Sequence, residues 1–192
     1  MKALFKIYIS ALGLMALLPI TVLSAPQQER PAIQVGQIFN GKVIGVASGE
    51  TFTMITSENR EIEVWLAEIE APEKGQVYWD ASRQILVEKV LTNEVTIQVV
   101  SIKDLEDGYD YVIAQAYAGN KWINREMVAE GWAWHFPQYF QSQELALAEQ
   151  EAKEKKLGLW AVANPETPFE YQTTPQVVPE ENQIQPLIKV QW

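Results

Sequence analysis

The stretch that decides the fold is E-V-W-L-A-E-I-E-A-P-E, which runs from Glu63 to Glu73. It begins with alternating polar and apolar residues, the pattern of a half-buried strand, and then reaches Ala71-Pro72. Proline has no N–H for a sheet and fixes the local backbone, so a turn is expected there. On a strand that continues to this turn, Glu68 and Glu70 share a face, and Glu73 lies just beyond it. Carboxylates at one strand end predict either a site for a hard cation or a solvated acidic rim.

Outward from this stretch, the chain alternates between short strand-like and helix-like segments. Residues 37–47, 50–56 and 61–69 read as strands joined by short turns, as do residues 94–102 and 109–118. A helical period appears over residues 76–91, and again after Asn124 and Ser142, with Gly131 and Gly158 as the expected helix ends. This order predicts an α+β fold, a small five-stranded barrel with added helices.

The ends of the chain differ in composition from the middle, so we expect one domain with tails. Lys2 and Lys6 precede an apolar run that ends near Ser24, which predicts a signal peptide over residues 1–24. The alternative is an uncleaved membrane anchor. Residues 25–35 form a linker, residues 36–162 the domain, and residues 163–192 a proline-rich extended tail. We therefore expect an exported protein, periplasmic or extracellular, with no membrane association after cleavage.

Composition excludes several kinds of site. The chain has no cysteine and one histidine, His135, so neither a thiolate site nor a multi-histidine zinc site can form within it. His135 lies in an apolar run and is expected to be structural. The formal net charge is −10, and loss of Lys2 and Lys6 with the signal would make it −12. Nucleic acid is thus a disfavoured partner, though not an excluded one, because such binding depends on cations that neutralise phosphates.

Five segments together resemble the staphylococcal nuclease-like (thermonuclease) domain family, in one order over about residues 36–162. They are S-G-E-T from Ser48, W-L-A-E-I-E-A-P-E from Trp65, G-Y-D-Y-V-I-A-Q-A-Y from Gly108, I-N-R-E-M-V-A-E-G-W-A from Ile123 and K-K-L-G-L-W from Lys155. The resemblance implies a five-stranded OB-type barrel with three helices. Active members of the family cut DNA or RNA phosphodiesters with one Ca²⁺.

The resemblance also assigns roles to individual positions. Glu50 and Glu70 match the metal-ligand aspartates, Ala71 the residue that lends a backbone carbonyl to the metal, and Glu73 the general base. Trp65 and Tyr111 stand where active members carry two phosphate-binding arginines, and Glu68 replaces a glycine. Tyr109 and Tyr139 match base-stacking tyrosines. These matches imply a weak Ca²⁺ site at most, with no other cofactor.

Loss of both arginines argues against efficient hydrolysis, because they stabilise charge that develops on the phosphoryl oxygens. We therefore expect a noncatalytic binding module for an unidentified protein, peptide or carbohydrate at the cell envelope. The alternative is a Ca²⁺-dependent phosphodiesterase or endonuclease with an altered site of Glu50, Glu70 and Glu73. Lys74 and Arg83 are then the nearest cations that could replace the arginines. Each residue can also be interpreted as structural. The glutamates would then form an acidic rim, Trp65 would be an aromatic residue of the barrel wall, and the tyrosines would pack on the surface.

Overall fold

The computed structural model describes residues 31–103, 110–138 and 141–174. Residues 33–192 form one compact unit and residues 1–32 another. All the helices and strands named below lie in residues 33–192. The predicted signal peptide, most of the predicted linker, Tyr109, Tyr139 and residues 175–192 of the predicted tail lie outside the described residues.

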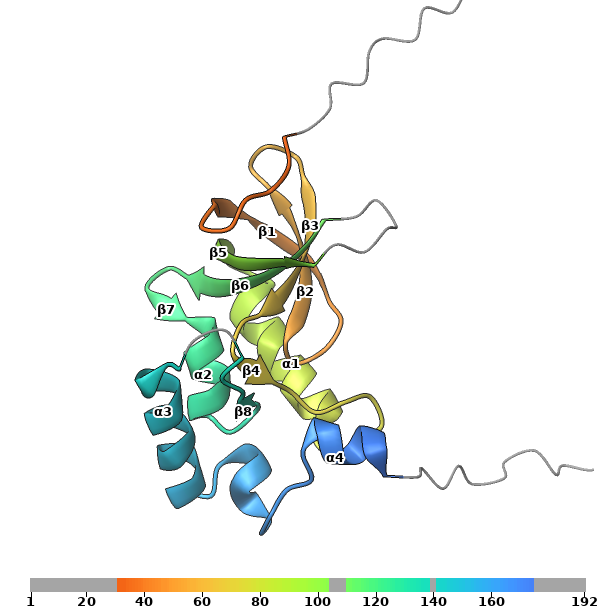
Figure 1. The fold of residues 1–192 in the computed structure, drawn as a ribbon, viewed down its shortest axis with the longest axis vertical. Coiled ribbons are helices and arrows are strands. Elements are labelled where there is room, and N and C mark those ends of the chain that lie inside the picture. Colours follow the sequence, from red (N-terminus) through yellow and green to blue (C-terminus); the bar gives the residue numbers. More distant parts are fainter. Residues whose placement is uncertain (1–30, 104–109, 139–140, 175–192) are drawn as a thin grey trace, which may run out of the picture. The chain divides into compact units, whose positions relative to one another are not determined.

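Five strands close into a barrel, as predicted (Figure 1). Antiparallel pairing gives the order β3-β2-β1-β5-β6, and a parallel pairing between β3 and β6 closes it. β1 and β5 each carry an irregularity in their register, after Val43 and Val99, which increases local bending. The strands are β1 (Ile38–Val46), β2 (Thr51–Thr56), β3 (Glu61–Leu66), β5 (Glu94–Lys103) and β6 (Tyr111–Ala118), and the two-residue β7 (Lys121–Trp122) extends the sheet beyond β6.

The core fills the barrel and continues beneath the helices. Residues in β1 alternate between exposed and buried, as expected for a strand with one face on a core. Phe52, Met54 and Ile62 from the barrel and Leu86 and Met127 from two helices are almost fully buried in one cluster. The barrel and its helices are therefore a single packed body.

The three predicted helices are present: α1 (Trp79–Val90), α2 (Ile123–Ala129) and α3 (Gln143–Glu154). Ser142 caps α3 as predicted, because its side chain accepts a hydrogen bond from the N–H of Leu145. Gly131 and Gly158 follow α2 and α3 with positive φ, and a Cβ on either would collide with the other's backbone loop. The N–H of Leu159 in the short helix η1 (Gly158–Ala161) donates to the carbonyl of Gly131, which joins these two ends.

The third strand is shorter than predicted. β3 ends at Leu66, and Glu68 has a φ of 61°, in the left-handed region. A separate two-residue strand, β4 (Ile69–Glu70), then pairs with β8 (Trp134–His135). The prediction that Glu68 and Glu70 share a face of one strand is therefore wrong, because Glu68 lies in the turn after β3 and Glu70 in the separate strand β4. The positive φ also explains why the family pattern has glycine where this chain has Glu68.

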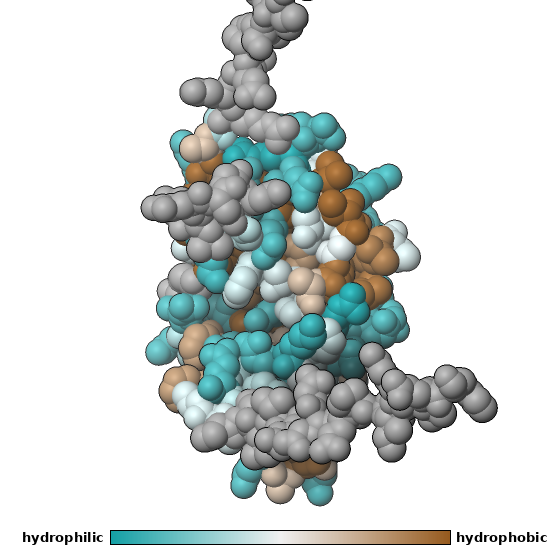
Figure 2. Space-filling view, turned by 90° about the vertical axis from the view of Figure 1, so that its right-hand side faces the viewer, coloured by the Kyte–Doolittle hydropathy of each residue, from teal (hydrophilic) through white to brown (hydrophobic). Residues whose placement is uncertain are grey.

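The predicted extended tail contains a helix, α4 (Pro168–Thr173), which begins with a complete capping box between Thr167 and Glu170. In Figure 1, α4 lies beside the loop that leads from β4 to α1. On the face shown in Figure 2, hydrophobic residues form a patch near the right edge, and hydrophilic ones cover much of the rest. None of the helices within the described ranges has the length and apolar character needed to cross a membrane.

Candidate functional site

Glu50 is placed by the tight turn that joins β1 to β2. Gly49 in this turn has no room for a side chain, because a Cβ there would overlap Ser82 of α1 and lie 2.8 Å from the Cβ of Ala71. The carboxylate of Glu50 then accepts a hydrogen bond from the N–H of Ala71 through Oε2 at 2.8 Å. Glu50 therefore contacts Ala71, the residue predicted to lend its backbone carbonyl to a metal, but the hydrogen bond is to the N–H of Ala71.

Glu70 and Glu73 flank Ala71-Pro72 on the other side of this corner. Glu70 is the last residue of β4 and is partly buried. Glu73 lies in the following loop, where its N–H donates to Oε1 of Gln76 at 2.9 Å. Its own carboxylate accepts a hydrogen bond from Nε2 of Gln172 in α4 at 2.7 Å. The structure thus brings Glu50, Glu70, Ala71 and Glu73 together, which we call the carboxylate corner.

The amide of Gln76 links this corner to the tail segment. Its oxygen accepts from Glu73, and its Nε2 donates to the carbonyl oxygen of Glu166, just before α4. On the same loop, Gly75 has a φ of 95°, and a Cβ there would lie 2.6 Å from the hydroxyl of Tyr171. The base position predicted from sequence is therefore covered by a segment that the sequence assigned to an extended tail.

Burial and neighbouring carboxylates raise the pKa of two glutamates at the carboxylate corner, Glu50 and Glu70. Burial raises the pKa of Glu50 to about 8; the N–H of Ala71 opposes this rise, and Glu70 and Glu73 add to it. The pKa of Glu70 is also raised, first by burial and then by Glu73. Glu50 is therefore mostly neutral near pH 7 when no cation is bound, and a metal would have to displace its proton.

The predicted metal ligands do not fit a metal ion in the arrangement that the structure gives them. Among the described residues, no group of three or more Asp, Glu, His or Cys side chains is placed to hold one. Calcium takes six to eight oxygen ligands, whereas one oxygen of Glu50 is engaged with a backbone N–H and one of Glu73 with Gln172. Calcium binding therefore stays a prediction, and no chemical step is assigned to it.

Trp65 and Tyr111 lie on the outer wall of the barrel, on the neighbouring strands β3 and β6. Their parallel register pairs Glu63 with Tyr111 and Trp65 with Ile113, so both aromatic residues occupy one face of the sheet. Nε1 of Trp65 donates to Oε1 of Glu63 at 3.0 Å, which fixes the ring. We call this pair the aromatic wall; Trp65 lines a cavity with Glu50 and Glu70, and Tyr111 lines a separate one with Glu63.

A cation that the sequence did not indicate reaches this wall. The ammonium of Lys103, the last residue of β5, lies 3.2 Å from the ring centroid of Trp65. Lys103 and Trp65 line a cavity of about 150 Å³ together with Glu50, Glu70 and Phe136. Lys103 also lowers the pKa of Glu50, though less than the N–H of Ala71 does. Only the strand register reveals this contact, because 38 positions separate the two residues in the sequence.

The arginines of the described residues are held elsewhere. Arg60 makes two hydrogen bonds to Asp110, at 2.6 and 2.7 Å, and Arg125 pairs with Glu144 at 3.0 Å. Nε of Arg83 donates to the carbonyl of Val46 at 3.0 Å, so Arg83 does not serve as the predicted replacement cation. Lys74 is exposed and does not line the cavity at Trp65.

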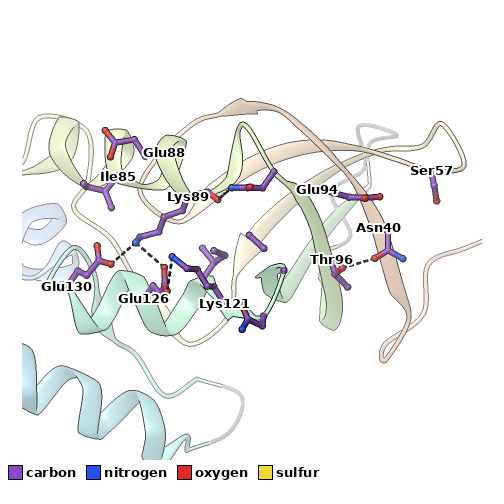
Figure 3. Close-up of a pocket in the computed structure, with 15 residues that line it drawn as sticks. Asn40, Ser57, Ile85, Glu88, Lys89, Glu94, Thr96, Lys121, Glu126 and Glu130 are labelled. Carbon is purple, nitrogen blue, oxygen red and sulfur yellow. Dashed lines mark hydrogen bonds and ion pairs between the residues drawn. The ribbon is translucent and has the colours of Figure 1, made fainter.

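A larger cavity, of about 930 Å³, lies away from all the predicted site residues (Figure 3). Lys89 of α1 pairs there with Glu126 and Glu130 at 3.2 and 2.7 Å. On its other side, the hydroxyl of Thr96 donates to Oδ1 of Asn40 at 2.7 Å. The polar groups in this cavity largely satisfy one another, so size alone does not make it the functional site.

Comparison with known proteins agrees with the barrel described above. Residues 63–162 match the family described as staphylococcal nuclease homologue. The chain belongs to the staphylococcal nuclease family. An uncharacterized endonuclease of Haemophilus influenzae is 33% identical, over 84% of this chain and 91% of that protein. A micrococcal nuclease of Shigella flexneri is 29% identical, over 69% of this chain and 80% of that protein.

Members of this family also occur as parts of longer proteins. The staphylococcal-like nuclease CAN1 of Arabidopsis thaliana is 32% identical over 66% of this chain, but the match covers only 39% of that protein. The family match in this chain includes Trp65, Glu70, Glu73 and Tyr111, whereas Glu50 precedes it. Membership therefore accounts for the fold and for its relation to nucleases, and the chemistry depends on the residues at these positions.

Proposed function

We propose that this member of the staphylococcal nuclease family is an exported, non-hydrolytic binding module. One observation supports this most directly: none of the arginines among the described residues lines the cavity that Trp65 shares with Glu50 and Glu70. Trp65 and Tyr111 occupy the two positions, and Arg60, Arg83 and Arg125 are engaged elsewhere. Export follows from the sequence of residues 1–24.

The loss is large in energetic terms. An arginine that stabilises the transition state of phosphoryl transfer contributes roughly 10³- to 10⁵-fold in rate. Trp65 and Tyr111 carry no charge that could take this role. Lys103 supplies a single point charge without the forked geometry of a guanidinium, and this charge already lies on the ring of Trp65.

A second candidate function is a phosphodiesterase with an altered site. Lys103 favours it, because its ammonium lines the same cavity as Glu50 and Glu70 and could approach a bound phosphate. In that case Glu73 would serve as the base, as the family resemblance implies.

The two candidates are separated by incubating the mature protein with single-stranded DNA in millimolar Ca²⁺, beside a Glu73→Gln control. We expect no cleavage above that control. Cleavage that depends on both Glu73 and Lys103 would replace the binding-module proposal with the phosphodiesterase. A calorimetric Ca²⁺ titration addresses the metal separately, and we expect weak binding or none, since the carboxylates do not form a metal cluster.

A further inference from the structure

The cavity beside Trp65 combines one aromatic face with carboxyl groups and an ammonium ion. Lys103 places its ammonium 3.2 Å from the ring centroid of Trp65. Glu50 and Glu70 line the same cavity, and Phe136, 43% exposed, lies at its rim. Ring faces carry negative potential and attract cations, most strongly for tryptophan. The ring face in this cavity is therefore complementary to a positive charge.

Apart from an electrostatic influence on Glu50, the ring of Trp65 is the contact that Lys103 makes among the described residues. Within the described parts of the chain it has no ion-pair partner, whereas Lys89, Lys121, Lys153 and Lys155 each pair with a glutamate. The ring in turn is fixed by the hydrogen bond from its Nε1 to Glu63, which leaves its face to the ammonium. The ammonium of Lys103 thus occupies a position on the face of Trp65 that suits a cation.

We propose that this cavity binds a lysine or arginine side chain of a partner protein, which takes the place of Lys103 on Trp65. The inference rests on the proposed function and names its ligand class, because hydrolysis would need the same space for a phosphate. Trp65 stands where the resemblance implies a phosphate-binding arginine, so this position would now attract a cation instead of an anion. The formal charge of −10 over the whole chain adds long-range attraction for a basic segment.

The larger cavity of Figure 3 differs from the cavity at Trp65 in how its lysines are paired. It also contains lysines and glutamates, but there Lys89 already lies between two carboxylates, and Lys121 approaches Glu126 at 3.8 Å. A ligand cation would have to break those ion pairs. At Trp65 it would displace a lysine that makes no ion pair with any residue in the described ranges.

The test is calorimetric titration of the mature protein with a six-residue peptide of alternating alanine and lysine. A peptide with glutamine at each lysine position is the control ligand. Trp65→Leu should weaken binding roughly 3- to 30-fold, the range expected for one cation–π contact, and Trp65→Phe should restore much of it. Lys103→Met should strengthen binding, because it removes the internal competitor.

Lys42→Met is the matched control for Lys103→Met. Lys42 is exposed on β1 and does not line the cavity, so its loss changes the net charge equally without vacating the ring. Equal effects of these two variants, or unchanged affinity in Trp65→Leu, would overturn the inference. If Trp65→Leu does not fold, as judged by thermal unfolding, the comparison of Lys103→Met with Lys42→Met still tests the inference. Wild-type cleavage of DNA would instead overturn the proposed function, so the two failures are distinguishable.

Discussion

The carboxylate corner and the aromatic wall are the two halves of the site that the family resemblance implies, and they differ in how the fold holds them. In the corner, backbone groups make the decisive contacts: the N–H of Ala71 binds Glu50, and the N–H of Glu73 binds Gln76. On the wall, Trp65 and Tyr111 project from regular strands whose ladder bonds do not involve their side chains. Exchange on the wall therefore leaves the backbone intact, whereas the corner is part of the fold.

This difference accounts for the pattern of matches to the family. By the family resemblance, the corner keeps carboxylates at three positions, with Glu where Asp is expected at the two ligand positions, while Trp65 and Tyr111 stand where arginines are expected. A side chain on the outer face of a barrel can change its chemistry at small cost in stability. A site of this kind can change what it binds on its wall while its corner stays the same.

The largest effect is expected at Asn124, which joins the two halves. Its side chain accepts from the N–H of Ala116 and donates to the carbonyls of Ala67 and Ala114, and Ala67 lies in the turn between wall and corner. Asn124→Ala removes these bonds from a fully buried position, so we expect a loss of about 2–4 kcal/mol in unfolding free energy. Urea unfolding measures it, with Asn93→Ala, which loses one exposed bond, as control. Similar losses of unfolding free energy in Asn124→Ala and Asn93→Ala would contradict the argument that Asn124 holds the two halves together.

A smaller, pH-dependent effect is expected in the corner. The pKa of Glu50 is raised from 4.5 to about 8 on folding, chiefly by burial. The folded state therefore favours the protonated form, and this contribution is present below pH 4.5 and lost as the pH rises through about 8. Glu50→Gln removes the titration and keeps an acceptor for Ala71. It should be more stable than the wild type by about 1–3 kcal/mol near pH 9, with little difference near pH 5.

Thermal unfolding across that pH range tests this expectation. Glu88→Gln is the matched control, since it removes the same formal charge from α1 away from the corner. A constant difference between Glu50→Gln and the wild type at all pH values would contradict the burial argument.

The barrel followed from sequence because its signals are local. Alternation, turn residues and helix caps predicted five strands and three helices, and Ser142 caps α3 as its sequence indicates. The prediction failed where one residue departs from its usual conformation. Glu68 takes a positive φ, which is uncommon for a residue with a side chain. The sequence pattern therefore predicts one strand over residues 61–69, whereas β3 ends at Leu66.

Two parts of the site needed three-dimensional information. Lys103 meets Trp65 only through the register of β5, β6 and β3, which pairing sets and local sequence does not. The helix α4 did have a local signal, T-P-F-E from Thr167 to Glu170, which is a capping box with proline at the first helical position. The surrounding prolines obscured it, and its contact with Glu73 spans 99 residues.

The smallest effect is expected where α4 meets the corner, and it tests whether the tail helps to hold that half. Gln76 is buried and connects the N–H of Glu73 to the carbonyl of Glu166, whereas the bond from Gln172 to Glu73 is exposed. We expect Gln76→Ala to cost about 1–2 kcal/mol in unfolding free energy and to speed amide hydrogen exchange in residues 168–173. Gln172→Ala should cost under about 0.5 kcal/mol, because water replaces an exposed partner. Unchanged exchange in Gln76→Ala would mean that α4 packs independently of the corner, and then the wall and the corner would both be set by the barrel alone.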